Sequence, residues 1–232
     1  MEFITKETKL QQKILALIPA YNESGHIHDV VKRTREFLPV LVVDDGSTDQ
    51  TAVQAEEAGA TVIRQRPNQG KGAALIQGFQ YAVAQGYDAV VMLDADGQHD
   101  PNEIPALVKS FIHTGADLVV GKRDFSKMPI IRRCSNTIGR FMLSWAMGNE
   151  IPDNQSGYRL LSSRLVQEMI KSRERGFEFE VEMIVVCLKQ GWKLAWVPIQ
   201  TIYADEKSHI RPLHHVIHYF RIVWKARRTM RE

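Results

Sequence analysis

Short, continuously apolar segments alternate with amphipathic segments along the first 120 residues, and this alternation constrains the fold more than any other feature. The apolar segments predict β-strands at residues 14–18, 40–43, 60–63, 88–93 and 117–120. The segments between them repeat apolar side chains at spacings of three and four and predict helices over 24–38, 47–58 and 71–85 and after Pro101. Apolar strands that alternate with helices are typical of a mainly parallel sheet covered by helices on both faces. We therefore expect an α/β fold.

The second half of the chain is less regular. Its patterns predict helices over 130–148, 163–172 and 178–189 and a short strand over 194–198. An apolar stripe at helical spacing then runs from Leu213 to Trp224. We expect an N-terminal extension over 1–13, a single domain over 14–210 and a basic amphipathic helix over 211–232. That helix could pack on the protein or place its basic face on an anionic membrane.

Charge is distributed unevenly between the two halves. Residues 1–120 carry 10 Lys and Arg against 16 Asp and Glu, whereas residues 121–232 carry 20 against 11. An acidic half around a metal and a basic half for an anionic partner would give this pattern, and so would uneven surface charge without a function.

Cysteine content and hydropathy favour a cytoplasmic protein. The two cysteines, Cys134 and Cys187, give neither a metal-binding spacing nor a disulfide framework, which favours a reducing compartment. No apolar run approaches the roughly 20 residues that span a bilayer. We therefore expect any membrane contact to be peripheral, at the inner face of the membrane.

Two carboxylates separated by one residue end the apolar strand at 88–93. Asp94 and Asp96 are followed by the carboxamide Gln98 and the imidazole His99. In an open α/β sheet, ligands bind beyond the carboxyl ends of the strands. Oxygen ligands at such a position suit a divalent cation that also holds phosphate oxygens.

Polar residues also follow the first two predicted strands. Pro19-Ala20-Tyr21-Asn22-Glu23 follows the first, and Asp44-Asp45-Gly46-Ser47 follows the second. A nucleotide diphosphate needs carboxylates for base and ribose hydroxyls, an aromatic ring for stacking and a metal for the phosphates. The strand ends together therefore predict a nucleotide site. Taken singly, Asp44 or Asp45 also suits a turn or a helix cap.

The loop Asn68-Gln69-Gly70-Lys71-Gly72 contributes to the same prediction. Its glycines permit a close backbone approach, and Lys71 places a cation at a helix N-terminus, which suits an anion. The loop is not a P-loop, because Gly72 follows the lysine and the upstream glycine is missing.

Together these motifs resemble the inverting family-2 glycosyltransferases of GT-A fold. The resemblance rests on P-A-Y-N-E after the first strand, V-V-D-D-G-S-T-D, N-x-G-K-G and L-D-A-D-x-Q-H, and it spans about residues 14–210. It is strongest to the polyprenyl-phosphate sugar synthases of the dolichyl-phosphate mannose synthase type. Such a protein has a Rossmann-like, mixed but mainly parallel sheet flanked by helices in a single domain.

The resemblance implies roles for the donor site, with a GDP- or UDP-sugar as donor and no nucleic-acid partner. Nucleotide contacts are expected from Pro19, Tyr21, Glu23, Asp44, Asp45, Gly70 and Asp94. Mg²⁺ or Mn²⁺ would be held, with the diphosphate, by Asp94, Asp96 and Gln98. His209 lies in a late loop that closes over the donor in related enzymes and is a further candidate metal ligand. Lys71 is expected near the diphosphate as a catalytic residue.

The resemblance also implies an acceptor site in the second half, for a lipid phosphate. In the polyprenyl-phosphate enzymes, arginines hold the acceptor phosphate. Arg123 with Arg132 or Arg133 could form this clamp beside Ser135, because guanidinium groups match phosphate bidentately. A solvated helix start is the alternative for Arg132 and Arg133. Arg159 suits a structural role as well as acceptor binding.

The reaction inferred is a single in-line displacement at the anomeric carbon, with inversion. A phosphate acceptor is already anionic and needs no strong base, whereas a hydroxyl of a saccharide or small molecule needs a carboxylate within hydrogen-bond reach. Asp153 is the candidate catalytic base, with Glu180 or Glu182 behind it. A different alternative is a phosphohydrolase of the haloacid dehalogenase type, whose opening motif residues 93–97 imitate.

Overall fold

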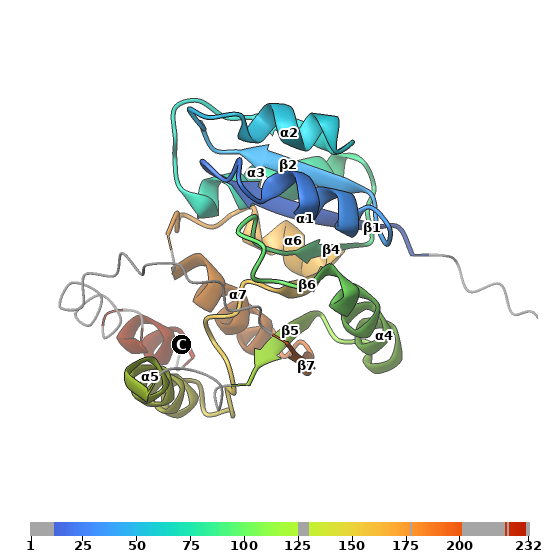
Figure 1. The fold of residues 1–232 in the computed structure, drawn as a ribbon. Helices are drawn as coiled ribbons and strands as arrows, with labels where there is room; N and C mark the ends of the chain where they lie inside the picture. The colour runs from blue at the N-terminus through green and yellow to red at the C-terminus, as the bar shows by residue number, and fades with distance from the viewer. Residues whose placement is uncertain (1–11, 125–129, 177, 201–220, 222, 231–232) are drawn as a thin grey trace, which may run out of the picture.

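The computed structural model describes residues 12–124, 130–176, 178–200, 221 and 223–230, and for residues 130–136 the backbone alone. One seven-stranded sheet runs through this part of the chain, in the order β3-β2-β1-β4-β6-β5-β7 (Figure 1). The strands are β1 Ile14–Ala20, β2 Val40–Asp44, β3 Thr61–Arg64, β4 Ala89–Met92, β5 Leu118–Arg123, β6 Arg159–Ser162 and β7 Leu194–Ile199. The helices are α1 Ile27–Thr34, α2 Thr51–Glu57, α3 Lys71–Ala84, η1 Pro101–Glu103, α4 Ile104–Thr114, α5 Ile130–Met147, α6 Ser163–Met169 and α7 Glu178–Lys189.

The sheet is mixed but mainly parallel, as expected. β1 pairs in parallel with β2 and β4, β2 pairs in parallel with β3, and β5 pairs in parallel with β7. Only β6, among the described strands, runs the other way, because it pairs antiparallel with both β4 and β5. The sequence prediction missed β6, since four residues that begin with a buried arginine do not form an apolar run.

The insertion of β6 determines where the second half meets the first. Arg159, the first residue of β6, is in register with Met92 of β4 and Val120 of β5. Met92 is the last residue of β4. The segment that leads into β6, residues 153–158, therefore lies at the same sheet edge as the polar residues that follow β1, β2 and β4.

Helices α1 and α2 begin later than the sequence pattern predicts. The residues before them are held by hydrogen bonds between the loops that follow β1 and β2. The Asn22 N–H donates to Ser47 Oγ at 2.9 Å, the Thr48 N–H donates to Asn22 Oδ1 at 2.9 Å, and the Ser24 N–H donates to Asp49 Oδ2 at 3.2 Å. The side chains of Asn22, Ser47 and Asp49 thus join the two loops.

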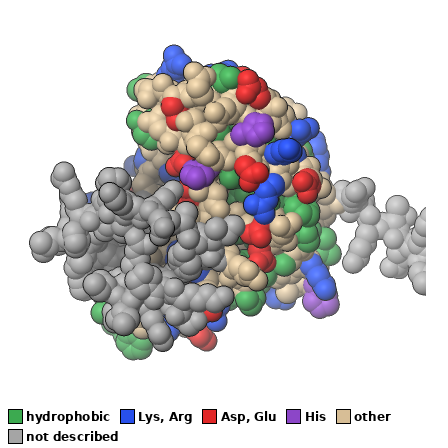
Figure 2. Space-filling model, viewed as in Figure 1, with side chains coloured by type: hydrophobic (Ala, Val, Ile, Leu, Met, Phe, Trp, Pro, Cys, Tyr) green, Lys and Arg blue, Asp and Glu red, His purple; other side chains and the backbone are tan. Residues whose placement is uncertain are grey.

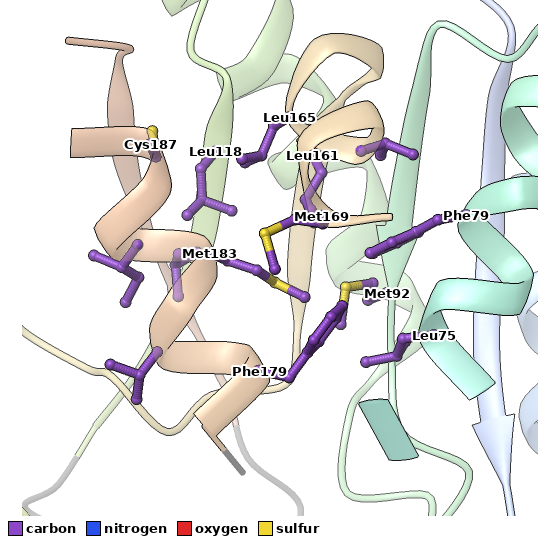
Figure 3. Close-up of a cluster of buried hydrophobic side chains, with 14 of the residues drawn as sticks. Leu75, Phe79, Met92, Leu118, Leu161, Leu165, Met169, Phe179, Met183 and Cys187 are labelled. Atoms are coloured by element: carbon purple, nitrogen blue, oxygen red, sulfur yellow. The ribbon is translucent and has the colours of Figure 1, made fainter. Parts of the chain in front are cut away.

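The core lies in two layers, one on each face of the sheet. Alternate residues of β1 face opposite sides: Leu15 and Leu17 join one cluster, and Ala16 and Ile18 join the other. Helices α3, α5, α6 and α7 cover the first face, and α1, α2 and α4 cover the second. Figure 3 shows the first cluster, in which the rings of Phe79 from α3 and Phe179 from α7 stack with centroids 6.1 Å apart.

Both chain ends fall largely outside the described residues. This applies to residues 1–11 of the expected N-terminal extension and to residues 211–220 of the expected C-terminal helix. Residues 223–229 are helical, and Val223 and Ala226 are buried in the same cluster as α5. Among the described helices, none combines the length and the apolar character needed to cross a membrane.

A fully buried arginine at the start of β6 joins three segments of the second half. Arg159 Nε donates to the Ser156 carbonyl at 2.8 Å, Nη2 donates to the Asn154 carbonyl at 3.1 Å, and Nη1 donates to the Glu180 carbonyl. Burial lowers the pKa of this guanidinium, although the charges of nearby carboxylates act in the opposite direction. The contacts of Arg159 are those of a structural residue.

Replacing Arg159 by Met should destabilise the protein by about 2–4 kcal/mol, because three buried carbonyl oxygens would lose their donor. The matched control is Arg64→Met, which removes an exposed ion pair with Glu56 at 2.7 Å and should change stability by less than about 1 kcal/mol. Urea denaturation followed by circular dichroism gives the free energies of unfolding. Equal changes in the two variants would contradict the role assigned to Arg159.

Candidate active site

A pocket of about 400 Å³ opens at the sheet edge where β1, β2 and β4 end. It is lined by Pro19, Ala20, Tyr21, Glu23, Asp45, Asn68, Gly70, Lys71, Ala74, Asp94, Ala95 and Asp96. The polar residues that the sequence places after the first, second and fourth strands therefore share one cavity. The loop that precedes α3 completes its wall.

Tyr21 and Glu23 follow β1 in a turn that the neighbouring loop holds. Asn22 has a left-handed backbone with φ of 55°, which asparagine tolerates better than most residues. The Glu23 N–H donates to Thr51 Oγ1 at 2.8 Å. Tyr21 remains 48% exposed at the pocket, where its ring can stack on a planar group.

The adjacent residues Asp44 and Asp45 have different roles. Asp45 lines the pocket, and its carboxylate accepts hydrogen bonds from Gln65 Nε2 at 2.7 Å and from the N–H groups of Gln69 and Gly70, both at 2.8 Å. Asp45 thus fixes the loop that precedes α3. Asp44 is 2% exposed and does not line the pocket. Its Oδ1 accepts from the Ser47 N–H at 3.2 Å, which is the turn role left open for it above.

The glycines before and within α3 accommodate protein backbone. The Gly72 N–H donates to the Arg175 carbonyl at 2.9 Å. A Cβ at Gly72 would lie 2.8 Å from the Arg175 carbonyl carbon, and one at Gly70 would lie 2.9 Å from the carbonyl oxygen. The close approach that the sequence suggested for a phosphate is made here by the segment before α7, although Gly70 also lines the pocket.

Lys71 bridges two carboxylates at the base of the pocket. Its Nζ lies 2.6 Å from Asp94 Oδ1 and 2.7 Å from Glu180 Oε1. Burial favours the neutral amine, but the charges of Asp94 and Glu180 outweigh this effect and raise the pKa of Lys71. Burial likewise opposes ionisation of Asp94, yet the lysine charge dominates and lowers the pKa of that carboxyl. Lys71 and Asp94 are therefore both charged near neutral pH.

The loop after β4 is held from within and from the second half of the chain. The Asp94 N–H donates to His99 Nδ1 at 3.0 Å, so the neutral His99 carries its proton on Nε2, and burial lowers the pKa of this histidine. The Gln98 N–H donates to Asp96 Oδ1 at 2.9 Å. The ring of Tyr158 stacks on His99 with centroids 5.0 Å apart, and its hydroxyl donates to the Asp100 carbonyl at 3.0 Å.

Gly157 forms a floor beneath the Asp94 carboxylate. A Cβ at this position would lie 2.6 Å from Asp94 Oδ2, so any side chain here would displace the Asp94 carboxylate. Sequence reasoning missed the roles of Gly157 and Tyr158, because contacts between residues about sixty positions apart leave no periodic pattern. The only local signal is a glycine between Ser156 and Tyr158, just before the short apolar pair of β6.

Arg123 and Asp153, expected in separate roles, form a bidentate ion pair. Arg123 Nε lies 2.7 Å from Asp153 Oδ2, and Nη2 lies 2.9 Å from Oδ1. The Asp153 side chain is fully buried and also accepts from the N–H groups of Arg123 and Gln155. This arrangement leaves Asp153 poorly placed to take a proton from an acceptor. The pair instead fixes the guanidinium of Arg123 at the end of β5.

Several expected site residues are not placed at the pocket. Gln98 belongs to the loop that carries Asp96 but does not line the cavity. Arg132, Arg133 and Ser135 lie in the first turns of α5, and their side chains are outside the described residues, as is the whole of His209. The predictions made for these four residues stay predictions. Glu182 accepts from the Ser172 hydroxyl, away from the pocket lining.

The two carboxylates after β4 suit a divalent cation whose remaining ligands come from the phosphates of a nucleotide. Among the described residues, no three His, Cys, Asp or Glu side chains gather in a metal-binding arrangement. Asp94 and Asp96 both line the pocket, and Asp94 Oδ1 already contacts one cation, the Lys71 ammonium. One or two carboxylates completed by phosphate oxygens and water are a common Mg²⁺ site. Asp94 and Asp96 would hold such an ion.

Comparisons with known proteins agree with this geometry. The chain is 32% identical over 205 residues to the undecaprenyl-phosphate mannosyltransferase of Micrococcus luteus, covering 81% of this chain and 82% of that protein. It is 30% identical over 217 residues to the UDP-N-acetylglucosamine–dolichyl-phosphate N-acetylglucosaminyltransferase of Methanococcus voltae, covering 83% and 86%. The fold matches a crystal structure of glucosyl-3-phosphoglycerate synthase from Mycobacterium tuberculosis in complex with Mn²⁺, UDP-glucose and phosphoglyceric acid, with a TM-score of 0.73 and 21% identity over 93% of this chain and 78% of that chain.

The same comparisons decide between the activity classes raised by the sequence. Residues 16–169 match the sequence profile described as Glycosyl transferase family 2, which excludes the phosphohydrolase alternative. The expected GT-A fold is confirmed by the structural match. The protein is thus a glycosyltransferase that belongs to family 2.

Proposed function

We propose that this glycosyltransferase moves a sugar from a nucleotide-diphosphate sugar to a polyprenyl phosphate, with inversion at the anomeric carbon and with a divalent cation. One observation carries the proposal: the 400 Å³ pocket joins two kinds of recognition in one cavity. Tyr21, Glu23 and Asp45 on one side suit a nucleoside. Lys71 with Asp94 and Asp96 on the other side suits a cation-bridged diphosphate.

Two observations favour a lipid phosphate over a hydroxyl as acceptor. The relatives from M. luteus and M. voltae are named for undecaprenyl phosphate and dolichyl phosphate. In addition, both oxygens of Asp153, the candidate base, accept hydrogen bonds from Arg123. A phosphate oxygen attacks without giving up a proton, so such an acceptor needs no base here. A saccharide or small-molecule hydroxyl remains the alternative.

In the proposed reaction, an oxygen of the acceptor phosphate attacks the anomeric carbon opposite the diphosphate. The bond from that carbon to the diphosphate oxygen breaks, and its electrons stay on the diphosphate. Lys71 would stabilise this developing charge, and Glu180 keeps the lysine ionised. Asp94 and Asp96 would hold the cation, which supplies further neutralisation of the leaving group when bound. His99 holds the Asp94 backbone, and Gly157 leaves room for the Asp94 carboxylate.

Asp96→Ala tests the metal and the acceptor class together. The wild-type enzyme with Mn²⁺ should transfer sugar from its UDP- or GDP-linked donor to polyprenyl phosphate and not to polyprenol. Asp96→Ala should lose at least about a thousandfold of this activity while remaining folded. Asp29→Ala, an exposed carboxylate on α1, is the control. Transfer to the alcohol alone would overturn the acceptor class, and unchanged turnover in Asp96→Ala would exclude a metal at this pair.

Lys71→Gln should change metal binding and turnover in opposite directions. The ammonium contacts Asp94 Oδ1 and therefore repels a divalent cation at the same carboxylate. We expect the affinity for Mn²⁺ without donor to rise about fivefold, or about 1 kcal/mol, and kcat to fall about a hundredfold. Titration of Mn²⁺ by electron paramagnetic resonance and steady-state kinetics measure the two effects, with Lys109→Gln on α4 as control. A loss of Mn²⁺ affinity would show that Lys71 does not compete with the metal.

Asp153→Asn distinguishes a positioning residue from a general base. If Asp153 orients Arg123, the variant should raise the acceptor KM about tenfold and leave kcat and its pH dependence nearly unchanged. A base at this position would instead lower kcat by about a hundredfold or more and remove one limb of the pH profile. Asp117→Asn, a buried carboxylate paired with Arg164 away from the pocket, controls for lost stability.

A further inference from the structure

Large apolar side chains lie exposed on α5 and on the helical segment 223–229. On α5, Ile138, Phe141 and Trp145 are 62%, 75% and 58% exposed. Their spacing of three and four places them on one face of the helix. Trp224 in the last helical segment is 75% exposed. Ile138, Phe141, Trp145 and Trp224 are called here the aromatic surface.

The two parts of the aromatic surface are joined by direct contacts. Arg227 lies with its guanidinium carbon 3.6 Å from the centre of the Trp145 ring, and its Nη1 donates to the Trp145 carbonyl at 3.3 Å. Trp224 is three residues before Arg227 and so lies on the same side of its helix. The opposite sides of both helices, including Leu143 and Val223, are buried in one core cluster. Figure 2 shows hydrophobic side chains at the lower margin of the molecule, where α5 lies in Figure 1.

Both helices are basic and carry no acidic residue. Residues 130–147 contain three arginines, residues 221–230 contain three arginines and one lysine, and neither range contains Asp or Glu. Both helices that carry the aromatic surface are therefore rich in positive charge, of which Lys225 is paired with Glu174. Tryptophan rings with basic neighbours are typical of protein segments that lie in the interface of an anionic bilayer. Basic residues near such a surface strengthen its binding to anionic lipid.

We propose that the aromatic surface docks the protein on an anionic lipid bilayer. The proposal deepens and rests on the proposed function, because a polyprenyl phosphate acceptor is held in a membrane. The position of α5 supports it: this helix follows β5, whose last residue, Arg123, lies at the sheet edge that carries the pocket. A bilayer under α5 would therefore lie on the acceptor side of the site. An acidic protein partner fits less well, because three of the four exposed side chains of the aromatic surface are large aromatic rings, which suit a lipid interface better than an acidic surface.

Vesicle binding by the full-length protein tests the proposal. The wild-type protein should float with vesicles of phosphatidylcholine and phosphatidylglycerol and bind much more weakly to phosphatidylcholine alone. The variant Phe141→Glu/Trp224→Glu should lower the binding constant at least about tenfold. The matched control Val53→Glu/Ile112→Glu changes two exposed apolar side chains on α2 and α4, at 43% and 47% exposure, and should bind as the wild type does.

Tryptophan quenching by brominated lipid gives an independent readout. The wild type should be quenched when it binds, and Trp145→Phe/Trp224→Phe should lose most of this quenching while it still floats with the vesicles. Equal quenching in the two proteins would place another part of the molecule in the bilayer and overturn the proposal. A third outcome would overturn the proposal in another way: the wild type self-associates and does not bind vesicles, whereas the variants are monomeric. The aromatic surface would then be a contact between copies of this chain.

Activity with a short-chain, water-soluble prenyl phosphate separates this proposal from the proposed function. The Phe141→Glu/Trp224→Glu variant should keep nearly wild-type turnover on the soluble acceptor and lose turnover on the long-chain acceptor in vesicles. Loss on both acceptors would overturn the docking role. A wild type that transfers to the soluble acceptor but ignores anionic vesicles would overturn the docking surface and leave the function intact. A wild type that binds vesicles but transfers to neither acceptor would overturn the proposed function and leave the docking surface intact.

Discussion

The bridge that the Lys71 ammonium forms between Asp94 and the buried Glu180 is the interaction on which the site depends. It joins the first turn of α3, the end of β4 and the first turn of α7. Taking charges out of water is costly, and an ion pair in a protein interior offsets that cost only when the geometry is good and further hydrogen bonds are present. Here the geometry is good, with both Nζ–oxygen distances below 2.8 Å. The three elements must therefore come together before the carboxylate of Glu180, the most buried of the three groups, has its partner.

The wider charge pattern explains why the site suits a cation and a diphosphate. Asp94, Asp96, Asp153 and Glu180 face Lys71, Arg123 and Arg159 in the same region, and His99 is neutral. Glu23 and Asp45 line the same pocket, so its carboxylates outnumber its cationic side chains. A divalent cation would reduce this excess of negative charge, and the bound cation would in turn attract the two negative charges of a nucleotide-diphosphate sugar. Cation and donor therefore favour each other's binding through charge alone.

The sequence could predict the elements whose pattern is local. Continuous apolar runs identified five strands of the sheet, and α7 begins and ends where its pattern placed it, at Glu178 and Lys189. The expected meeting of Tyr21, Asp45 and Asp94 in one cavity followed from parallel strands that share an edge. Local patterns could not reveal contacts between distant segments. Gly157 under Asp94, Arg175 against Gly72 and the pairing of Arg123 with Asp153 all required the fold.

The position of β6 has a consequence for the order in which the protein can be completed. β4, which is wholly buried, pairs on one side with β1 and on the other with β6, which comes almost seventy residues later in the chain. Until β6 has left the ribosome, the second side of β4 is an apolar strand edge with unpaired N–H and carbonyl groups. Such edges recruit strands from other chains. A nascent chain stalled between the two strands would be expected to aggregate. The same insertion that brings residues 153–158 to the edge of the active site thus makes synthesis the stage at which this fold is most exposed to failure.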